Sequence, residues 1–116
     1  MENKMIDSYR FGEIAINGKT YHSDLIIYPD KVDASWWRKQ GHNLCLDDIK
    51  DIIDYNPEVL IIGQGKSGLM MVPERIKSVI RNMGIDVYIS GTDKAVQTYN
   101  EMYKNRKVVA ALHLTC

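Results

Sequence analysis

Cysteine is scarce in this sequence, with only Cys45 and Cys116 among 116 residues. So few cysteines exclude a small domain held together by disulfides, and a chain of this length buries a core without them. No apolar run reaches the length of a membrane-spanning helix, and the first four residues, MENK, do not begin a secretory signal peptide. We therefore expect a cytoplasmic protein with reduced thiols and no membrane partner.

Net charge is also absent, because fifteen Lys and Arg residues balance fifteen Asp and Glu residues. A neutral chain has no overall field that would draw it to nucleic acid, so we expect no nucleic-acid partner. The densest basic run, residues 104–107, falls where a helix is expected to end, and there it complements the helix dipole. The hydrophobic content of 45% is that of a globular protein, and we expect a single domain over residues 1–116.

The order of apolar patterns predicts an α/β fold. A hairpin is expected first, because apolar residues flank Asn17-Gly18, the dipeptide best suited to a type I′ turn. Its second strand is expected to continue to Tyr28, where Pro29 stops the ladder, and residues 36–39 read as extended. The elements expected after these are a helix over 46–53, a strand over 59–62, a helix over 73–83, a strand over 87–89, a helix from an N-cap at Thr92 to Tyr103, and a strand over 108–114.

Residues 59–68, VLIIGQGKSG, match a dinucleotide-binding fingerprint in their letters. A true fingerprint starts its helix at the second glycine, whereas here Pro73 marks the helix start. Its ribose-binding acid follows the carboxyl end of the next strand, whereas Asp86 stands at the amino end. A phosphate loop would require glycine at the position of Leu60. We therefore interpret the segment as a glycine turn after a buried strand, and we expect no cofactor.

A small-ligand site remains open at the same loop, because open α/β sheets bind ligands beyond the carboxyl ends of their strands. Backbone N–H groups and one cation could hold a small anion there. The candidate ligand-binding residues are Gly63, Gly65, Lys66, Ser67, Gly68 and Thr92.

The cysteines occur in two H-x-x-C segments, His42 to Cys45 and His113 to Cys116. Two histidines and two cysteines suit tetrahedral zinc, but the spacing lacks the tight C-x-x-C knuckle, so we expect no metal. The alternatives are a Cys45–Cys116 disulfide, two buried free thiols, or a nucleophilic Cys116 with His113 as base. The carboxylate of Cys116 itself disfavours a thiolate, and we assign no catalytic residue.

Adjacent tryptophans indicate a binding surface. Successive residues of an extended segment face opposite ways, so we expect one of Trp36 and Trp37 in the core and the other on the surface. Arg38 and His42 follow them, and aromatic and guanidinium groups are enriched at protein interfaces. These four residues are the candidate interface.

The chain resembles a small domain family that includes the adipogenesis-associated domain-containing protein and the mitochondrial complex I assembly factor. The resemblance covers nearly the whole chain in order. The segments that carry it are residues 9–12, 37–38 with 41–42, 59–65, 84–87, 92–101 and the terminal 113–116.

The resemblance implies a three-layer α/β domain. Its central sheet is mixed and flanked by helices, the hairpin and the Trp segment add a β layer, and the last strand runs antiparallel to its neighbours. It also implies a non-enzymatic binding, assembly or regulatory module, with a protein or a small ligand as partner. Cys45 lies outside the family's pattern, whereas the terminal cysteine belongs to it. The alternative is an anion binder or enzyme that uses the Gly63–Gly68 loop, and we expect a monomer or a weak homodimer.

Overall fold

The computed structural model describes residues 5–116, so the residues on which the signal-peptide expectation rests lie outside the described part. The chain forms a three-stranded sheet in the order β1-β2-β3 and a five-stranded sheet in the order β5-β4-β8-β6-β7. The strands are β1 (Ile6–Arg10), β2 (Glu13–Ile16), β3 (Lys19–Tyr21), β4 (Leu25–Ile27), β5 (Val32–Asp33), β6 (Val59–Gln64), β7 (Asp86–Ser90) and β8 (Val108–His113). The helices are α1 (Lys50–Tyr55), α2 (Glu74–Asn82) and α3 (Thr92–Met102), and the 3-10 turn η1 (Leu46–Ile49) precedes α1.

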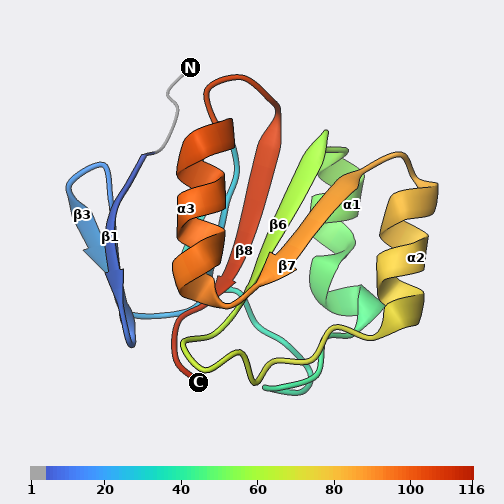
Figure 1. Cartoon of the computed structure of the whole chain (residues 1–116), viewed down its shortest axis with the longest axis horizontal. Coiled ribbons are helices and arrows are strands. Elements are labelled where there is room, and N and C mark those ends of the chain that lie inside the picture. The colour runs from blue at the N-terminus through green and yellow to red at the C-terminus, as the bar shows by residue number, and fades with distance from the viewer. Residues whose placement is uncertain (1–4) are drawn as a thin grey trace.

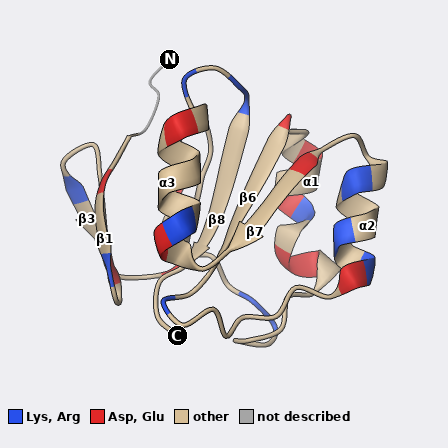
Figure 2. Ribbon diagram, viewed as in Figure 1, with Lys and Arg blue, Asp and Glu red and all other residues tan. Residues whose placement is uncertain are grey.

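The five-stranded sheet is the middle layer. Helix α3 and the small sheet cover one face, and α1 with α2 cover the other (Figure 1). Strands β6 and β8 are buried along nearly their whole length, as expected of continuous apolar runs in a sheet covered on both faces. Along the helices charges of both signs are interspersed, whereas β6 and β8 contain no Lys, Arg, Asp or Glu (Figure 2). The three-layer α/β prediction is confirmed.

The hairpin forms as predicted, with Asn17 at φ 49° and Gly18 at φ 82°, the positive values that a type I′ turn requires. Its second strand does not continue to Tyr28, because the chain leaves the small sheet after β3. Strand β4 instead pairs antiparallel with β8 in the central sheet, where Leu25 lies opposite Leu112. Residues 36–39 belong to neither sheet, so the expected contribution of the Trp segment to the extra β layer is wrong.

Strand β8 lies between β4 and β6 and runs antiparallel to the first and parallel to the second. The expectation of a last strand antiparallel to its neighbours therefore holds only on the β4 side. The reason is the crossover through α3, which returns the chain parallel to β6 and β7.

Helix ends follow the sequence with two exceptions, the first being that the helix expected over 46–53 is a 3-10 turn up to Ile49 and becomes an α-helix only at Lys50. Helix α1 ends at Asn56 in the left-handed region, with φ 59°, and Pro73 is the N-cap of α2. Helix α3, however, is capped by Gly91 without a side-chain bond, so Thr92 is its first residue rather than its cap. The Thr92 hydroxyl is directed elsewhere, toward β6 and β8.

Candidate functional site

The carboxyl ends of β6, β7 and β8 meet at one end of the molecule, where the polypeptide chain also ends (Figure 1). Four segments gather there, and backbone hydrogen bonds connect them: Gly12 N–H to Leu114 O, Leu69 N–H to Cys116 O and Met71 N–H to His42 O. We call this region the loop end, and it comprises residues 11–12, 36–45, 65–72 and 114–116.

The glycine loop is shaped by the close approach of other protein segments. A Cβ on Gly63 would lie 2.8 Å from Thr92 Oγ1 and 2.9 Å from Leu112 Cδ2. A Cβ on Gly65, whose φ is +99°, would lie 2.5 Å from the carbonyl carbon of Cys116. Both glycines are therefore required by contacts with α3, β8 and the chain terminus, so no bound phosphate is needed to explain them.

Four backbone donors of the loop already have acceptors within the protein. The bonds are Gly65 N–H to Thr92 Oγ1 at 2.9 Å, Lys66 N–H to Thr115 O at 2.6 Å, Gly68 N–H to Gly65 O at 3.2 Å and Leu69 N–H to Cys116 O at 3.0 Å. An anion-binding nest needs such groups aimed at open space. In this arrangement they tie the loop to α3 and to the tail.

The three side chains of the candidate ligand-binding set, those of Lys66, Ser67 and Thr92, have different surroundings. Lys66 pairs with Asp93 at 3.0 Å and lies 5.3 Å from the ring centroid of Tyr9, and Ser67 is exposed. Thr92 is fully buried; its hydroxyl accepts from Gly65 N–H and donates to His113 O at 2.6 Å. Thr92 therefore connects β6 to β8 and presents no free group to a ligand.

Beneath the loop end lies a buried polar group that we call the Asp24 cluster, consisting of Asp24, Arg38 and His113. Asp24 Oδ2 lies 2.8 Å from His113 Nδ1 and 2.9 Å from Arg38 Nη2, and Oδ1 accepts the Leu114 N–H at 2.7 Å. Arg38 Nη2 lies 3.1 Å from both Gly41 O and His113 Nδ1. Because a carboxylate only accepts, it fixes the hydrogen on Nδ1 and leaves Nε2 with the lone pair in the neutral ring.

The ionisation of Asp24 follows from these contacts. Burial raises the pKa of this carboxyl, but the hydrogen bonds from His113, the Leu114 N–H and Arg38 outweigh burial, so the net pKa is lowered. Asp24 is therefore a carboxylate at neutral pH, and it compensates the charge of Arg38 in a buried setting.

Three nitrogens of the cluster are buried without a hydrogen-bond partner among residues 5–116: Arg38 Nε, Arg38 Nη1 and His113 Nε2. The side chains of Arg38 and His113 are each only 6% exposed. Buried polar atoms are nearly always paired, so these three mark a place where a polar group from outside the chain would be favourable.

The candidate interface residues divide between core and surface. Trp36 is 6% exposed, its Nε1 donates to Asp48 O, and the Arg38 guanidinium lies 4.6 Å from its ring centroid. Trp37 is 73% exposed, which confirms the expected division of the two tryptophans. His42 is exposed, and its ring lies edge-on to His113 at 5.7 Å. Arg38, by contrast, is largely buried and contacts the Trp36 ring and Gly41 O.

Other segments of the loop end also carry exposed apolar side chains. Met71 is 63% exposed, and the Phe11 and Leu69 side chains are more than half exposed. Four of the large exposed hydrophobic residues thus belong to segments that are hydrogen-bonded to one another.

The two cysteines are free thiols, so the expected alternative of a Cys45–Cys116 disulfide is not formed. Cys45 precedes η1, and its Sγ lies 3.9 Å from Asn43 O, within its own segment. Cys116 is held by its backbone against Gly65 and Leu69. Within residues 5–116, no three His, Cys, Asp or Glu side chains are placed to share a metal ion.

Sequence reasoning missed Asp24 and gave His113 a role only within an H-x-x-C segment. No local pattern marks Asp24, because its partners lie far away in the sequence, at Arg38 and at residues 113–114. Phe11, Leu69 and Met71 were also missed, since exposure of an apolar residue in a loop has no sequence signature.

The fold and the loop end define a small α/β domain. Its glycine loop packs against the backbone of Thr115 and Cys116. The chain belongs to the family described as "Protein of unknown function (DUF498/DUF598)", which matches residues 6–113. Within the described residues, no helix is long and apolar enough to cross a membrane.

Solved structures share this fold over nearly their full length. MT938 is 26% identical, with 98% of this chain and 100% of that chain covered and a TM-score of 0.80. A conserved hypothetical protein from Pyrococcus horikoshii is 23% identical, with 96% and 98% covered and a TM-score of 0.80. A protein from Bordetella pertussis, described as a Mth938-like domain, is 23% identical, with 96% and 85% covered and a TM-score of 0.66.

Proposed function

We propose that this chain is a non-enzymatic protein-binding module whose partner docks on the loop end. The observation that carries the proposal is the exposure of Trp37, which is 73% accessible and adjacent to the firmly held Trp36 and Arg38. An exposed tryptophan on a fixed segment loses little conformational entropy on binding and buries a large apolar area. Such residues dominate the energy of protein interfaces.

The Asp24 cluster supports this role by making the surface rigid. Arg38 is clamped by Asp24, by Gly41 O and by the Trp36 ring, so the backbone that presents Trp37 is held on both sides. Met71 is held in turn through its backbone bonds with residues 42–44. A preorganised patch of this kind binds with a smaller ordering cost than a mobile loop does.

A non-enzymatic role is supported by the surroundings of His113. The pair Asp24–His113 resembles the base of a catalytic triad, but a triad also needs a nucleophile hydrogen-bonded to Nε2. No hydroxyl or thiol of residues 5–116 lies within bonding distance of that nitrogen. The resemblance to the adipogenesis-associated protein and the complex I assembly factor further supports an assembly or regulatory task.

The test is site-specific cross-linking combined with a matched pair of alanine variants. A photo-reactive side chain at position 37 should capture a defined protein, whereas one at Met83, a comparably apolar and exposed site beyond the end of α2, should not. With the captured protein purified, Trp37→Ala should weaken binding by about tenfold or more, and Met83→Ala should not change it. Equal binding by both variants, or no specific capture at position 37, would argue against the proposal.

A second candidate, a site for a small anionic ligand, is favoured by the unpartnered donors Nε and Nη1 of Arg38, beside which His113 Nε2 would also donate when the ring is protonated. The other form of this idea, an anion in the Gly63–Gly68 loop, has less support because the N–H groups of Gly65, Lys66 and Gly68 are already bonded within the protein. Thermal shift with phosphate, acetate and nucleotides tests both forms; a ligand at a hundredfold its Kd stabilises by about 2.7 kcal/mol. A response lost in His113→Gln but kept in Lys66→Ala would assign the Asp24 cluster. The reverse would assign the loop, and a flat panel would exclude both.

A further inference from the structure

Strand β7 is an open edge of the central sheet. Among residues 5–116, the sheet order places β6 on one side of β7 and no strand on the other, and the opposite edge strand, β5, is only two residues long. In the parallel pair with β6, the Asp86 N–H donates to Glu58 O at 3.0 Å. Tyr88 and Ser90 lie two and four residues further along, so their backbone groups also point toward β6. Because alternate residues of a parallel strand bond to the same neighbour, the backbone groups of Val87 and Ile89 point away from β6.

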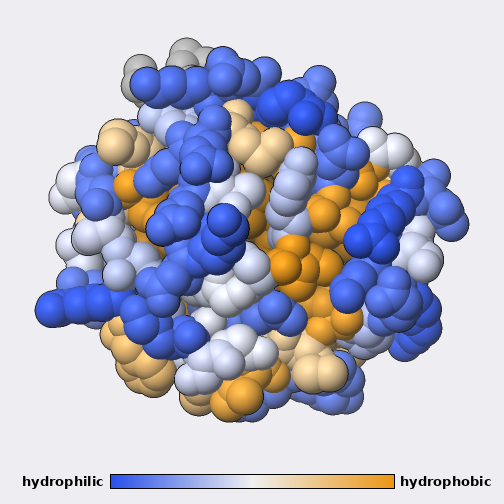
Figure 3. Space-filling model, viewed as in Figure 1, coloured by the Kyte–Doolittle hydropathy of each residue, from blue (hydrophilic) through white to orange (hydrophobic). Residues whose placement is uncertain are grey.

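The edge carries few of the features that block strand addition. Of its five residues, DVYIS, only Asp86 is charged, and there is neither lysine nor proline. Tyr88 is 43% exposed, and Val87 and Ile89 are only partly buried. An apolar band occupies this part of the surface, between the hydrophilic surfaces over α3 and α2 (Figure 3).

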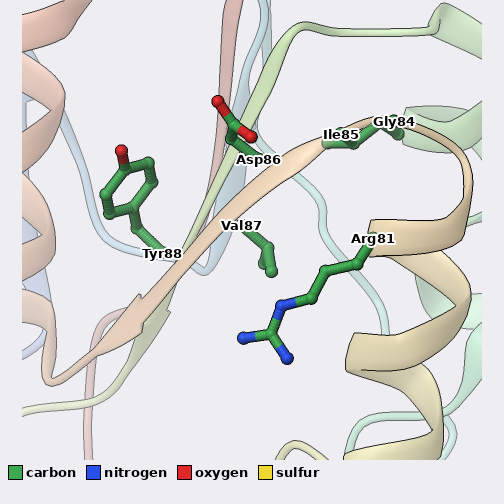
Figure 4. Close-up of a pocket in the computed structure, with 6 residues that line it drawn as sticks. All are labelled: Arg81, Gly84, Ile85, Asp86, Val87 and Tyr88. Carbon is green, nitrogen blue, oxygen red and sulfur yellow. The ribbon is translucent and has the colours of Figure 1, made fainter.

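A pocket of about 460 Å³ adjoins the strand. It is lined by Arg81 and by residues 84–88, and the Arg81 side chain extends from α2 toward Val87 (Figure 4). Val87 and Ile89 pack against the core beneath α1 and α2, so the pocket lies on the α2 side of β7. An apolar side chain from an added strand would be accommodated there.

We propose that β7 pairs with β7 of a second copy of this chain, antiparallel about a twofold axis at Tyr88. In this register Val87 faces Ile89 of the second copy and Ile89 faces Val87. These are two hydrogen-bonded pairs, each exchanging two bonds, which makes about four backbone hydrogen bonds. This interface lies along β7, between α2 and α3, and is separate from the loop end.

The side chains are self-complementary in the same register. Asp86 faces Ser90 of the second copy, so no like charges oppose each other across the ladder. Tyr88 faces its own counterpart in the close, non-hydrogen-bonded position, where aromatic pairs are favourable. Ile89 of the second copy lies beside Val87 at the pocket and covers the apolar band. A contact through one five-residue strand on each side is small beside the about 800 Å² per partner of stable interfaces, so we expect a weak dimer.

The experiment is sedimentation velocity of the full chain from micromolar to millimolar concentration. The wild type should show a concentration-dependent dimer. Val87→Pro removes an outward N–H without touching the β6 ladder, so the variant should stay monomeric while keeping its circular dichroism spectrum. Tyr88→Lys and Tyr88→Glu should each be monomeric, because like charges oppose at the axis, and Leu46→Lys on η1 should dimerise as the wild type does.

Mixing the two Tyr88 variants is the most specific test of the proposed pairing. Tyr88→Lys combined with Tyr88→Glu should restore dimers, since only a mixed pair places opposite charges across the axis. A monomeric wild type at all concentrations, dimers that survive Val87→Pro and both Tyr88 variants, or a mixture that stays monomeric would each overturn the proposal. Capture of a different protein by a cross-linker at position 88, with the wild type monomeric, would likewise overturn self-pairing and assign the edge to a foreign strand.

Discussion

The α-carbon of Gly65 faces the backbone of Cys116 so closely that a Cβ would lie 2.5 Å from its carbonyl carbon and 2.6 Å from its carbonyl oxygen. The φ of Gly65, +99°, adds backbone strain for any other residue. Gly65→Ala should therefore destabilise the protein by about 3 kcal/mol, from overpacking and strain together. Urea unfolding followed by tryptophan fluorescence measures this loss.

Gly68→Ala is the matched control for that prediction. Gly68 also has a positive φ, +71°, but nothing lies within 4 Å of the place that a Cβ would occupy. Its substitution should cost about 1 kcal/mol, from backbone strain alone. Equal losses for the two variants would mean that the tail does not pack against Gly65.

Thr92→Val removes a hydroxyl that serves two buried backbone groups. The variant keeps the shape but leaves Gly65 N–H and His113 O without partners. We expect a loss of about 3 kcal/mol in the free energy of unfolding, because unpaired buried polar groups cost about 1–3 kcal/mol each. Thr98→Val, which removes an exposed bond to Lys94 O, should change stability by less than about 0.5 kcal/mol. A neutral Thr92→Val would contradict the link that this hydroxyl makes between β6 and β8.

Asp24 should make stability depend on pH in the acid range. Its pKa is lowered in the folded state, so its contribution is complete above the unfolded value of about 4. That contribution is lost as pH falls through the folded-state pKa. Asp24→Asn should lose about 3 kcal/mol at neutral pH, and its deficit should shrink toward pH 2. Unfolding curves at several pH values provide the measurement.

Asp47→Asn is the comparison for this pH effect. Asp47 also pairs with a cation, Lys39 at 2.8 Å, but both side chains are mostly exposed. Water and salt screen an exposed ion pair, so this variant should have nearly the wild-type stability at every pH. A pH-independent deficit in Asp24→Asn would show that Asp24 acts through packing rather than through its charge.

Both cysteines should react as free thiols. Intact mass without reductant should equal the fully reduced mass, and alkylation of the unfolded chain should label Cys45 and Cys116 alike. Labelling of the folded chain should be slower, since both residues are partly buried. A mass lower by two hydrogens before reduction would instead show that the two cysteines form a disulfide.

Local chemistry made much of the fold predictable. The turn at Asn17-Gly18, the helix start after Pro73 and the position of Asp86 at the amino end of β7 all follow from residues a few positions apart. Strand partnership does not, because it is decided by distant segments. Leu25 pairs with Leu112, and the residues around Leu25 give no indication of this partner.

The candidate site was harder to predict for a related reason. A glycine-rich turn looks the same in sequence whether a phosphate or the protein's own backbone approaches it. At Gly65 the approaching group is the carbonyl of Cys116, fifty-one residues later by the numbering. Likewise, Arg38 has the sequence character of a surface residue, and only the placement of Asp24 and His113 beside it explains its burial.

The central place of β8 bears on how the protein is made. Strands β4 and β6 are both synthesised before β8, yet β8 is the strand that joins them into one sheet. On the ribosome the earlier part of the chain therefore carries two separate strand edges and an incomplete core. The native sheet can therefore close only after residue 113 has emerged from the ribosome, so the central sheet is completed by the last of its strands to be synthesised.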